Sequence, residues 1–388
     1  GGWVVRRARR QIPGPSRAAT GGEPLVVPRL ERFDEPLPLD CGRVLPRFEI
    51  AFETWGRLSP ARDNAVLVCH PLTADAHAAG RHGHADERPG WWDAAIGPGR
   101  MLDTRRWFVI CSNALGGWGG STGPSSRDEA SGRPWGGDFP VITVSDIVRA
   151  QGRLVARLGL ERLRAVVGGC FGGQQALLWA IEHPEQAAAA VVVGTTAATS
   201  AHTIATFSVM RKLIREDAHW RGGHYYGHAF PSRGLSSALA VAVPLWMSRE
   251  ALERRFGRRR LEGANPRFTL EPEFEVEAYL ERVSTAPRVP VDPNGLMTLM
   301  RAEEYFDLER QFGGLEEAFR PVRARVLLVS HRGDWRYPPR EVQRLQDALV
   351  AVGADARHEV CDSALGHAAI RYDVASFAPA VRAFLEGS

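Results

Sequence analysis

The chain has 388 residues, 44% of them hydrophobic, which is enough for one large α/β domain with an insertion or for two ordinary domains. No apolar run approaches the roughly 20 residues of a membrane-spanning helix, and the 49 basic residues are scattered among 45 acidic ones, so the sequence predicts neither a membrane nor a nucleic-acid partner. Five cysteines, an odd number without paired spacing, imply neither a disulfide framework nor a zinc cluster and favour reduced thiols in the cytoplasm.

The first part of the chain, residues 1–36, is predicted to be a disordered basic leader. It consists largely of Arg, Pro, Gly and Ala without periodicity, and such a composition buries too little apolar surface to order itself. The fold is therefore expected to begin near Leu37. Residues 48–54 alternate in polarity, which is typical of an edge or antiparallel strand. Residues 65–69 are continuously apolar, which is typical of a central strand covered on both faces.

Strands and helices alternate along most of the remaining chain. Strands are predicted at 107–111, 165–167, 188–193, 326–329 and 356–360, and helices at 145–158 and 375–385. This alternation predicts an α/β protein with a mostly parallel, doubly wound sheet. Between 196 and 320 helices and loops rich in Trp, Tyr, His and Arg indicate a helical lid inserted above the strand ends. The lid divides the sheet domain into a first part, 37–195, and a second part, 321–388.

One turn in this pattern carries a reactive side chain. Gly168-x-Cys170-x-Gly172 follows a strand, precedes a helical pattern and has the spacing of a nucleophile elbow. Glycines flank the central residue of such a turn because the crowded backbone leaves no room for side chains. A buried structural cysteine would not need these glycines, so we expect Cys170 to be a nucleophile.

The order of residues along the chain predicts the partners of this thiol. In elbow architectures an acid and then a histidine follow the nucleophile, on loops after late strands. Asp334 follows the strand at 326–329, and His367 follows the strand at 356–360. We expect His367 to accept the Cys170 proton and Asp334 to hold the imidazole in its tautomer.

Backbone amides near the nucleophile are predicted to stabilise the tetrahedral oxyanion. One belongs to Phe171, directly after the nucleophile. The other belongs to Leu72, in the loop after the strand at 65–69, since the neighbouring Pro71 has no N–H. The glycine-rich run 115–124 follows no dinucleotide or P-loop spacing and is interpreted as a shaped active-site loop.

A histidine-rich loop raises the question of a metal site. His70, His77, His82 and His84 match no zinc spacing, and no acidic ligand or thiolate pair accompanies them. We therefore expect no metal and no bound cofactor.

From about Leu37 to Leu385 the chain resembles the homoserine O-acetyltransferases of the α/β-hydrolase fold. The resemblance is carried by the segments NAVLVCH at 64–70, GWWD at 90–93, IGPG at 96–99, FVICSN at 108–113, GSTGPSS at 120–126, DFPVITV at 138–144 and GGQQAL at 172–177. Members of this family transfer acetyl, or in relatives succinyl, from coenzyme A to an amino-acid hydroxyl by a ping-pong route. The resemblance implies a biosynthetic acyltransferase, an acyl-enzyme at Cys170, and a lid through which a homodimer can form.

The chain also departs from the pattern of this family. The nucleophile is cysteine, whereas the family ordinarily has serine. Leu239, Trp246 and Met247 stand where the lid of the family carries an arginine for the substrate carboxylate and a Tyr-Arg pair, and Ala368 replaces an acid for the substrate amine. An apolar pocket offers no partners for buried charges. The departures therefore predict an acceptor other than free homoserine.

Three functions remain open on the sequence. The first is an acyltransferase that moves an acyl group from a thioester, on coenzyme A or a carrier protein, through an acyl-cysteine. The second is a carrier-protein shuttle or thioesterase on the same triad, which an elbow cysteine suits because transfer between thioesters is nearly isoenergetic. The third is a non-enzymatic protein that kept the fold, against which the intact triad and elbow glycines argue.

Overall fold

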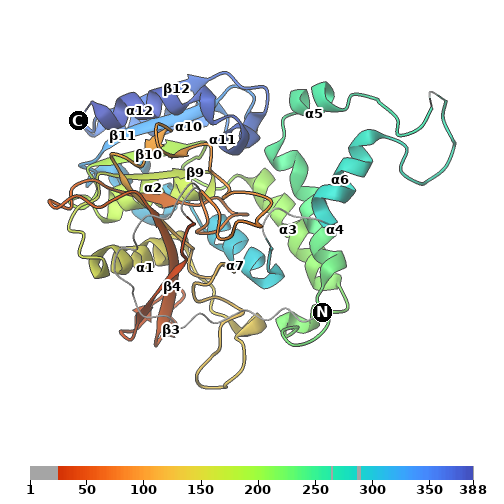
Figure 1. The fold of residues 1–388 in the computed structure, drawn as a ribbon, viewed down its shortest axis with the longest axis horizontal. Helices are drawn as coiled ribbons and strands as arrows, with labels where there is room; N and C mark the ends of the chain where they lie inside the picture. The colour runs from red at the N-terminus through yellow and green to blue at the C-terminus, as the bar shows by residue number, and fades with distance from the viewer. Residues whose placement is uncertain (1–24, 264, 286–289, 388) are drawn as a thin grey trace.

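An eight-stranded sheet forms the centre of the computed structural model, which describes residues 25–263, 265–285 and 290–387. The strands lie in the order β1-β4-β8-β5-β9-β10-β11-β12. Figure 1 labels β4 and the strands from β9 to β12. In chain order they are β1 Arg29–Phe33, β4 Phe48–Trp55, β5 Ala65–Cys69, β8 Phe108–Ser112, β9 Ala165–Gly169, β10 Ala189–Val193, β11 Arg325–His331 and β12 Ala356–Cys361. From β8 to β12 all neighbours pair in parallel, whereas β4 pairs antiparallel with β1 and β8. The mostly parallel sheet and the antiparallel strand at 48–54 are thus confirmed.

The central strands are positioned by their continuous apolar sequences. Every residue of β5, β9 and β10 is buried, as expected for strands covered on both faces. The register pairs Cys69 with Gly168 and Val193 with Gly169, so the carboxyl ends of these three strands meet at one edge. Ligands of open α/β sheets bind beyond that edge.

The sheet domain has five α-helices among the described residues, and the sequence predicts bounds for the first and the last of them. They are α1 Val144–Arg157, α2 Phe171–Glu182, α10 Pro339–Ala351, α11 Ala369–Tyr372 and α12 Ala378–Glu386. A capping box between Thr143 and Asp146 begins α1, which lies one residue from its predicted bounds. The last helix begins three residues later than predicted, because proline occupies its first turn and a separate 3-10 turn precedes it. None of the described helices is long and apolar enough to cross a bilayer.

Two small strand pairs complete this part of the chain. They are antiparallel β2 Leu37–Pro38 with β3 Val44–Leu45, and parallel β6 Ile96–Gly97 with β7 Leu102–Asp103. Both lie outside the central sheet.

The prediction that the fold begins near Leu37 is wrong by one strand, because β1 lies within the predicted leader. Most of its side chains are exposed, and only Phe33 is buried, stacked on Phe48 at a ring distance of 4.6 Å. An edge strand gains its order from backbone hydrogen bonds to its neighbour and needs only one apolar anchor, so its composition resembles that of a loop. Residues 1–24 of the predicted leader lie outside the described residues.

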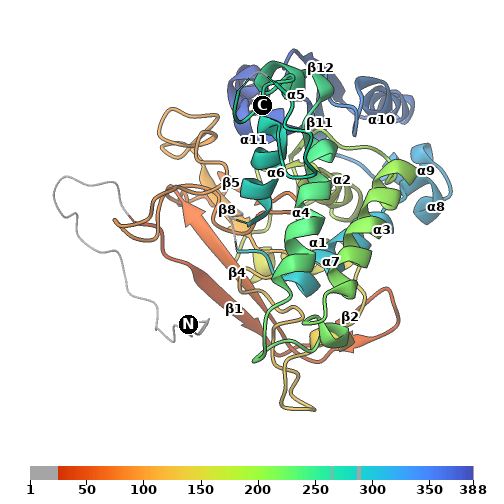
Figure 2. The same cartoon turned by 90° about the vertical axis from the view of Figure 1, so that its right-hand side faces the viewer.

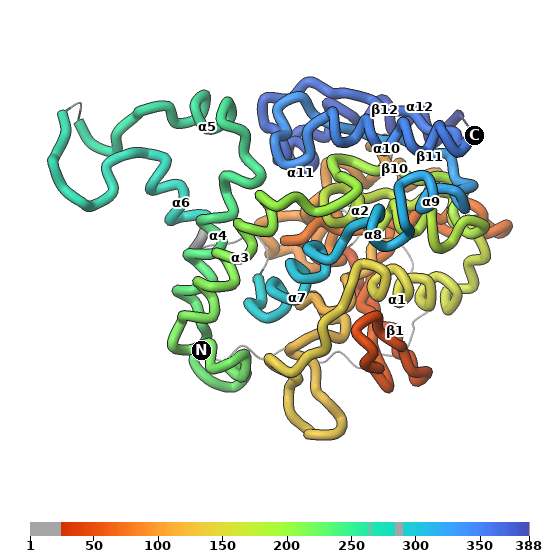
Figure 3. The backbone as a smooth tube through the Cα atoms, turned by 180° about the vertical axis from the view of Figure 1, so that it is seen from behind, coloured from red at the N-terminus to blue at the C-terminus, as the bar shows by residue number. Residues whose placement is uncertain are grey.

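The helical lid leaves the sheet after β10 and returns before β11, which are neighbours in the sheet. Its helices are α3 Ala201–Glu216, α4 Ser232–Trp246, α5 Arg249–Arg255, α6 Glu275–Thr285, α7 Pro293–Glu304, α8 Leu308–Phe312 and α9 Leu315–Phe319. Helices α3 and α4 lie side by side at one end of the sheet (Figures 2 and 3). Phe207, Leu239 and Leu299 of the lid share the buried apolar cluster of the sheet, so the lid is packed onto it. As predicted, the described residues between 196 and 320 contain no strand.

Candidate active site

Cys170 lies in a sharp turn between β9 and α2. Its φ of 58° and ψ of −125° belong to a conformation that side chains other than glycine rarely adopt. A Cβ at Gly168 would lie 2.0 Å from the carbonyl oxygen of Gly172, and a Cβ at Gly172 would lie 2.0 Å from that of Cys69. Glycine is therefore required on both sides of Cys170, which is the geometry that the elbow spacing predicts.

His367 and Asp334 form a buried pair on the loops after β12 and β11. Nδ1 of His367 donates to Oδ2 of Asp334 at 2.8 Å. The other carboxylate oxygen of Asp334 accepts the backbone N–H groups of Arg336 and Tyr337, each at 3.0 Å. The carboxylate is thereby fixed in orientation, and it in turn fixes the tautomer and plane of the imidazole.

The electrostatics of this pair favour an ionised thiol. Burial lowers the pKa of His367, but the charges of Asp334 and Cys170 outweigh it and raise that pKa to about 9. Burial raises the pKa of Cys170, but the positive charges of Arg336 and His367, together with a hydrogen bond from His367, lower it overall. Both shifts favour a thiolate at Cys170 beside an imidazolium at His367, the form in which a cysteine reacts as a nucleophile.

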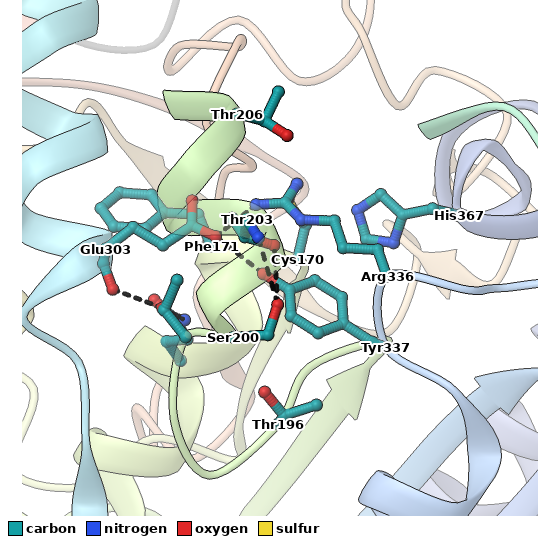
Figure 4. Close-up of polar contacts among 12 residues, drawn as sticks. Cys170, Phe171, Thr196, Ser200, Thr203, Thr206, Glu303, Arg336, Tyr337 and His367 are labelled. Atoms are coloured by element: carbon teal, nitrogen blue, oxygen red, sulfur yellow. Dashed lines mark hydrogen bonds and ion pairs between the residues drawn. The ribbon is translucent and has the colours of Figure 1, made fainter. Parts of the chain in front are cut away.

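An arginine that the sequence did not single out contacts Cys170. Nη1 of Arg336 donates to Sγ of Cys170 at 3.4 Å, and the guanidinium lies over the ring of Phe207 from α3. Figure 4 shows Arg336, Tyr337 and His367 converging on Cys170 at the start of α2. The sequence places Arg336 two residues after Asp334, but this position alone does not predict that its side chain reaches Cys170.

Arg336 is itself paired with a lid carboxylate. Its Nη2 forms an ion pair with Oε1 of Glu303, in the last turn of α7, and Tyr337 donates its hydroxyl to the same oxygen at 2.7 Å. Burial raises the pKa of Tyr337, so its hydroxyl stays protonated and remains a donor. The Arg336 and Glu303 side chains are only 3% and 0% exposed. The lid therefore contributes a charge to the site, and no local sequence signal marks Glu303.

The predicted oxyanion donors lie on the two segments that meet at the turn around Cys170. Phe171 begins α2, so its N–H belongs to the first helical turn, whose amides lack helical acceptors. Leu72 is buried in the loop after β5, and this loop contacts the turn because Gly172 packs against the carbonyls of Cys69 and His70. The role of Phe171 and Leu72 as donors stays a prediction.

The glycine-rich run closes on itself beside the same loop. Nε2 of His70 accepts the N–H of Ala114 at 2.9 Å, and Oδ1 of Asn113 accepts the N–H groups of Gly119 and Ser121. His70 is therefore a buried structural residue that joins the two loops.

The four residues predicted to shape the acceptor pocket do not form one group. Leu239 lies in the main apolar cluster, against which Trp246 is partly buried. Met247 packs inside the lid with Val243 and Ala251, and its sulfur accepts the hydroxyl of Tyr279. Ala368 is buried directly after His367. Among the four, only Ala368 adjoins the triad in the chain, and contact of any of them with an acceptor stays a prediction.

A groove at the edge of the lid approaches the triad from outside. It has a volume of about 650 Å³, and its lining includes His202 of α3, Met247 and Ser248 between α4 and α5, and Gly333 and Trp335 on either side of Asp334. Nε1 of Trp335 donates to the carbonyl of Pro244 in α4 at 2.9 Å, which ties the lid to the loop after β11.

Comparison with known proteins places this site in a family. Residues 64–362 match the family model described as alpha/beta hydrolase fold. The chain is 42% identical to a homoserine O-acetyltransferase of Rhodopseudomonas palustris, over 97% of this chain and 94% of the relative. It is 43% identical to a homoserine O-succinyltransferase of Halothiobacillus neapolitanus, over 88% of this chain and 85% of the relative.

Solved structures agree with these matches. The homoserine O-acetyltransferase of Bacillus anthracis superimposes with a TM-score of 0.86 at 30% identity, over 94% of this chain and 98% of that chain. Esterase E22 superimposes with a TM-score of 0.84 at 28% identity, over 93% and 100% of the two chains. The chain is therefore an acyltransferase that belongs to the homoserine O-acyltransferase family of the α/β-hydrolase fold.

Proposed function

We propose that this enzyme transfers an acyl group from acyl-coenzyme A to the hydroxyl of free homoserine through an acyl-Cys170 intermediate. The observation that carries the proposal is the buried Cys170, His367 and Asp334 arrangement at a glycine elbow, in a chain whose relatives are named for homoserine acylation. Because homoserine O-acyltransferases take their acyl group from coenzyme A, membership of this family favours coenzyme A over a carrier protein as the donor. It also favours a transferase over the shuttle or thioesterase.

The first half of the reaction forms the acyl-enzyme. The Cys170 thiolate attacks the thioester carbonyl, and the backbone N–H groups of Phe171 and Leu72 stabilise the oxyanion. Collapse breaks the bond to the sulfur of coenzyme A, which leaves as a thiol with the proton of the His367 imidazolium. One thioester replaces another, so the acyl group keeps its reactivity.

The second half of the reaction transfers the acyl group to homoserine and depends on the loss of the negative charge at Cys170. Acylation removes the thiolate charge that raises the pKa of His367, so the imidazole becomes a neutral base. It takes the proton of the homoserine hydroxyl, whose oxygen attacks the acyl carbonyl. Collapse releases the ester and restores the thiolate and the imidazolium.

Homoserine requires partners for its carboxylate and ammonium groups, and the sequence predicts none at Leu239 and Ala368. Arg336 and Glu303 offer such partners from other positions, beside the nucleophile. Nε of Arg336 and Oε2 of Glu303 are both buried without a hydrogen-bond partner among the described residues. We propose that the guanidinium contacts the acceptor carboxylate and that Glu303 contacts the ammonium, as charge-assisted bonds.

Intact mass spectrometry tests the acyl-enzyme. The protein is incubated separately with acetyl-coenzyme A and succinyl-coenzyme A, with Cys170→Ala as the control. We expect an adduct of the donor's acyl mass on Cys170 and none in the variant. Homoserine should then discharge the adduct and yield the O-acyl ester. Absence of an adduct, or discharge at the same rate without homoserine, would contradict the proposal.

Two acceptor analogues test the assignment of Arg336 and Glu303. The compound 3-aminopropan-1-ol lacks the carboxylate of homoserine, and 4-hydroxybutyrate lacks its amine. Arg336→Met should lower kcat/KM for homoserine by about 10- to 100-fold or more, yet leave that for 3-aminopropan-1-ol little changed once acylation is complete. Glu303→Gln should likewise lower kcat/KM for homoserine, yet leave kcat/KM for 4-hydroxybutyrate, which has no ammonium group, little changed. Equal losses on homoserine and its analogues would refute the assignment.

A further inference from the structure

Two histidines of the loop after β5 converge on a buried carboxylate that lies outside the active site. Glu53 is in β4 and is 3% exposed. Its Oε2 lies 2.9 Å from Nδ1 of His77, and its Oε1 lies 2.6 Å from Nε2 of His82. One ligand atom from each of the three residues lies within 4.8 Å of the others. The prediction that no acidic ligand accompanies these histidines was wrong. Glu53 is 24 residues from His77 in the chain, and only the fold brings its carboxylate to the loop.

The loop backbone holds both rings in place. The N–H of His77 donates to Oδ1 of Asp75 at 2.9 Å, and the N–H of His82 donates to Oδ2 of Asp86 at 2.8 Å. The two imidazole rings lie against each other with centroids 3.8 Å apart. The His82 side chain is 41% exposed, so the cluster is open to solvent on one side.

We propose that Glu53, His77 and His82 form a binding site for a divalent cation of the zinc type. Two imidazole nitrogens and one carboxylate oxygen are a donor set that zinc prefers, and water reaching the site past His82 supplies the fourth ligand. The ligand atoms of a tetrahedral zinc site lie about 3.4 Å apart, which follows from metal–ligand distances of about 2.0–2.2 Å. The three atoms lie close enough to reach that spacing by small side-chain rotations.

Binding replaces protons by the ion. An imidazole nitrogen ligates only when it carries no proton, so Nδ1 of His77 and Nε2 of His82 lose the protons that they now donate to Glu53. The ion then joins β4 to the loop whose first residues include Leu72. The competing explanation is that the histidines serve only to satisfy a buried carboxylate, in which case no ion binds.

The test uses the full-length protein with Cys170 blocked by iodoacetamide, so that the catalytic thiol cannot bind metal. The protein is freed of metal with a chelator and titrated with Zn²⁺ by calorimetry and with Co²⁺ by visible absorption. We expect one ion per chain, absorption bands of four-coordinate Co²⁺, and a higher unfolding temperature with Zn²⁺.

Two variants of exposed residues separate the site from adventitious binding. His82→Ala removes a ligand and should weaken Zn²⁺ binding at least about 10-fold and abolish the Co²⁺ bands. His84→Ala changes an exposed histidine of the same loop outside the cluster and should leave both unchanged. Unaltered binding in His82→Ala, or no binding at micromolar Zn²⁺ to the blocked parent protein, would overturn the proposal.

Discussion

Replacing Arg336 with methionine removes a positive charge that contacts the Cys170 sulfur. The contact is 3.4 Å from Nη1 to Sγ, and both side chains are buried. A unit charge about 4 Å away, at an effective dielectric constant of about 20, stabilises the thiolate by about 4 kcal/mol, or about three pH units. Glu303 opposes this effect, since its negative charge raises the pKa of Cys170. We therefore expect Arg336→Met to raise the pKa of the thiol by about one to two units.

Alkylation by iodoacetamide measures this pKa, because only the thiolate reacts. The rate is followed from pH 5 to 10 by mass spectrometry of the Cys170 peptide, with exposed Cys41 as the internal reference. In the parent protein the rate should reach its plateau below the ordinary thiol pKa of about 8.5, and in Arg336→Met the midpoint should move to higher pH.

Two further variants test the direction in which each charge shifts the pKa of Cys170. Glu303→Gln removes the opposing charge and should move the midpoint to lower pH. Arg336→Met combined with Glu303→Gln removes both charges and should fall between the single variants, without leaving a buried carboxylate unpaired. An unchanged midpoint in Arg336→Met, in protein that unfolds at the parental temperature, would refute the assignment of Arg336 to the thiolate.

Three other changes test the turn, the triad and a helix end. Gly172→Ala would place a Cβ 2.0 Å from the carbonyl oxygen of Cys69. We therefore expect the variant to form no acyl adduct and its free energy of unfolding, measured with urea, to fall by roughly 2–4 kcal/mol. Asp334→Asn removes one of the two charges, those of Asp334 and Cys170, that raise the pKa of His367 to about 9. The stability from that raised pKa is complete below about pH 6.5 and disappears as the pH rises through about 9, so the variant should lose up to about 3 kcal/mol at pH 6 and little at pH 10. Thr143→Ala removes the cap of α1 and should cost about 1 kcal/mol in urea unfolding without slowing acylation.

The parts of this protein that local sequence patterns describe were predicted well. Continuous apolar runs locate the central strands because burial on both faces leaves no polar position. The elbow could be predicted because the two glycines that its geometry requires, Gly168 and Gly172, lie within five consecutive residues. Asp334 and His367 could be found because chain order places them after late strands, and their hydrogen bond is present.

The parts that depend on contacts between distant segments could not be predicted. Arg336 and Glu303 are 33 residues apart and pair only because α7 of the lid lies against the loop after β11. No periodic sequence pattern indicates such a pair, and each residue alone resembles a charged surface residue. Met247 shows a different limit, because its packing against Tyr279 within the lid could not be predicted from its match to a family pocket, and its contact with an acceptor stays a prediction.

The fit of Gly172 against the carbonyl of Cys69 also bears on how this family can change its chemistry. The unusual backbone angles of residue 170 and the clearance on both sides of it depend on glycines, not on the sulfur. A serine at this position would occupy the same turn beside the same backbone amides, without any repacking of β9 or α2. Exchange between an oxygen and a sulfur nucleophile is therefore a single-residue step that the fold tolerates. We expect the charges of Arg336 and Glu303 beside position 170 to determine which of the two nucleophiles is effective.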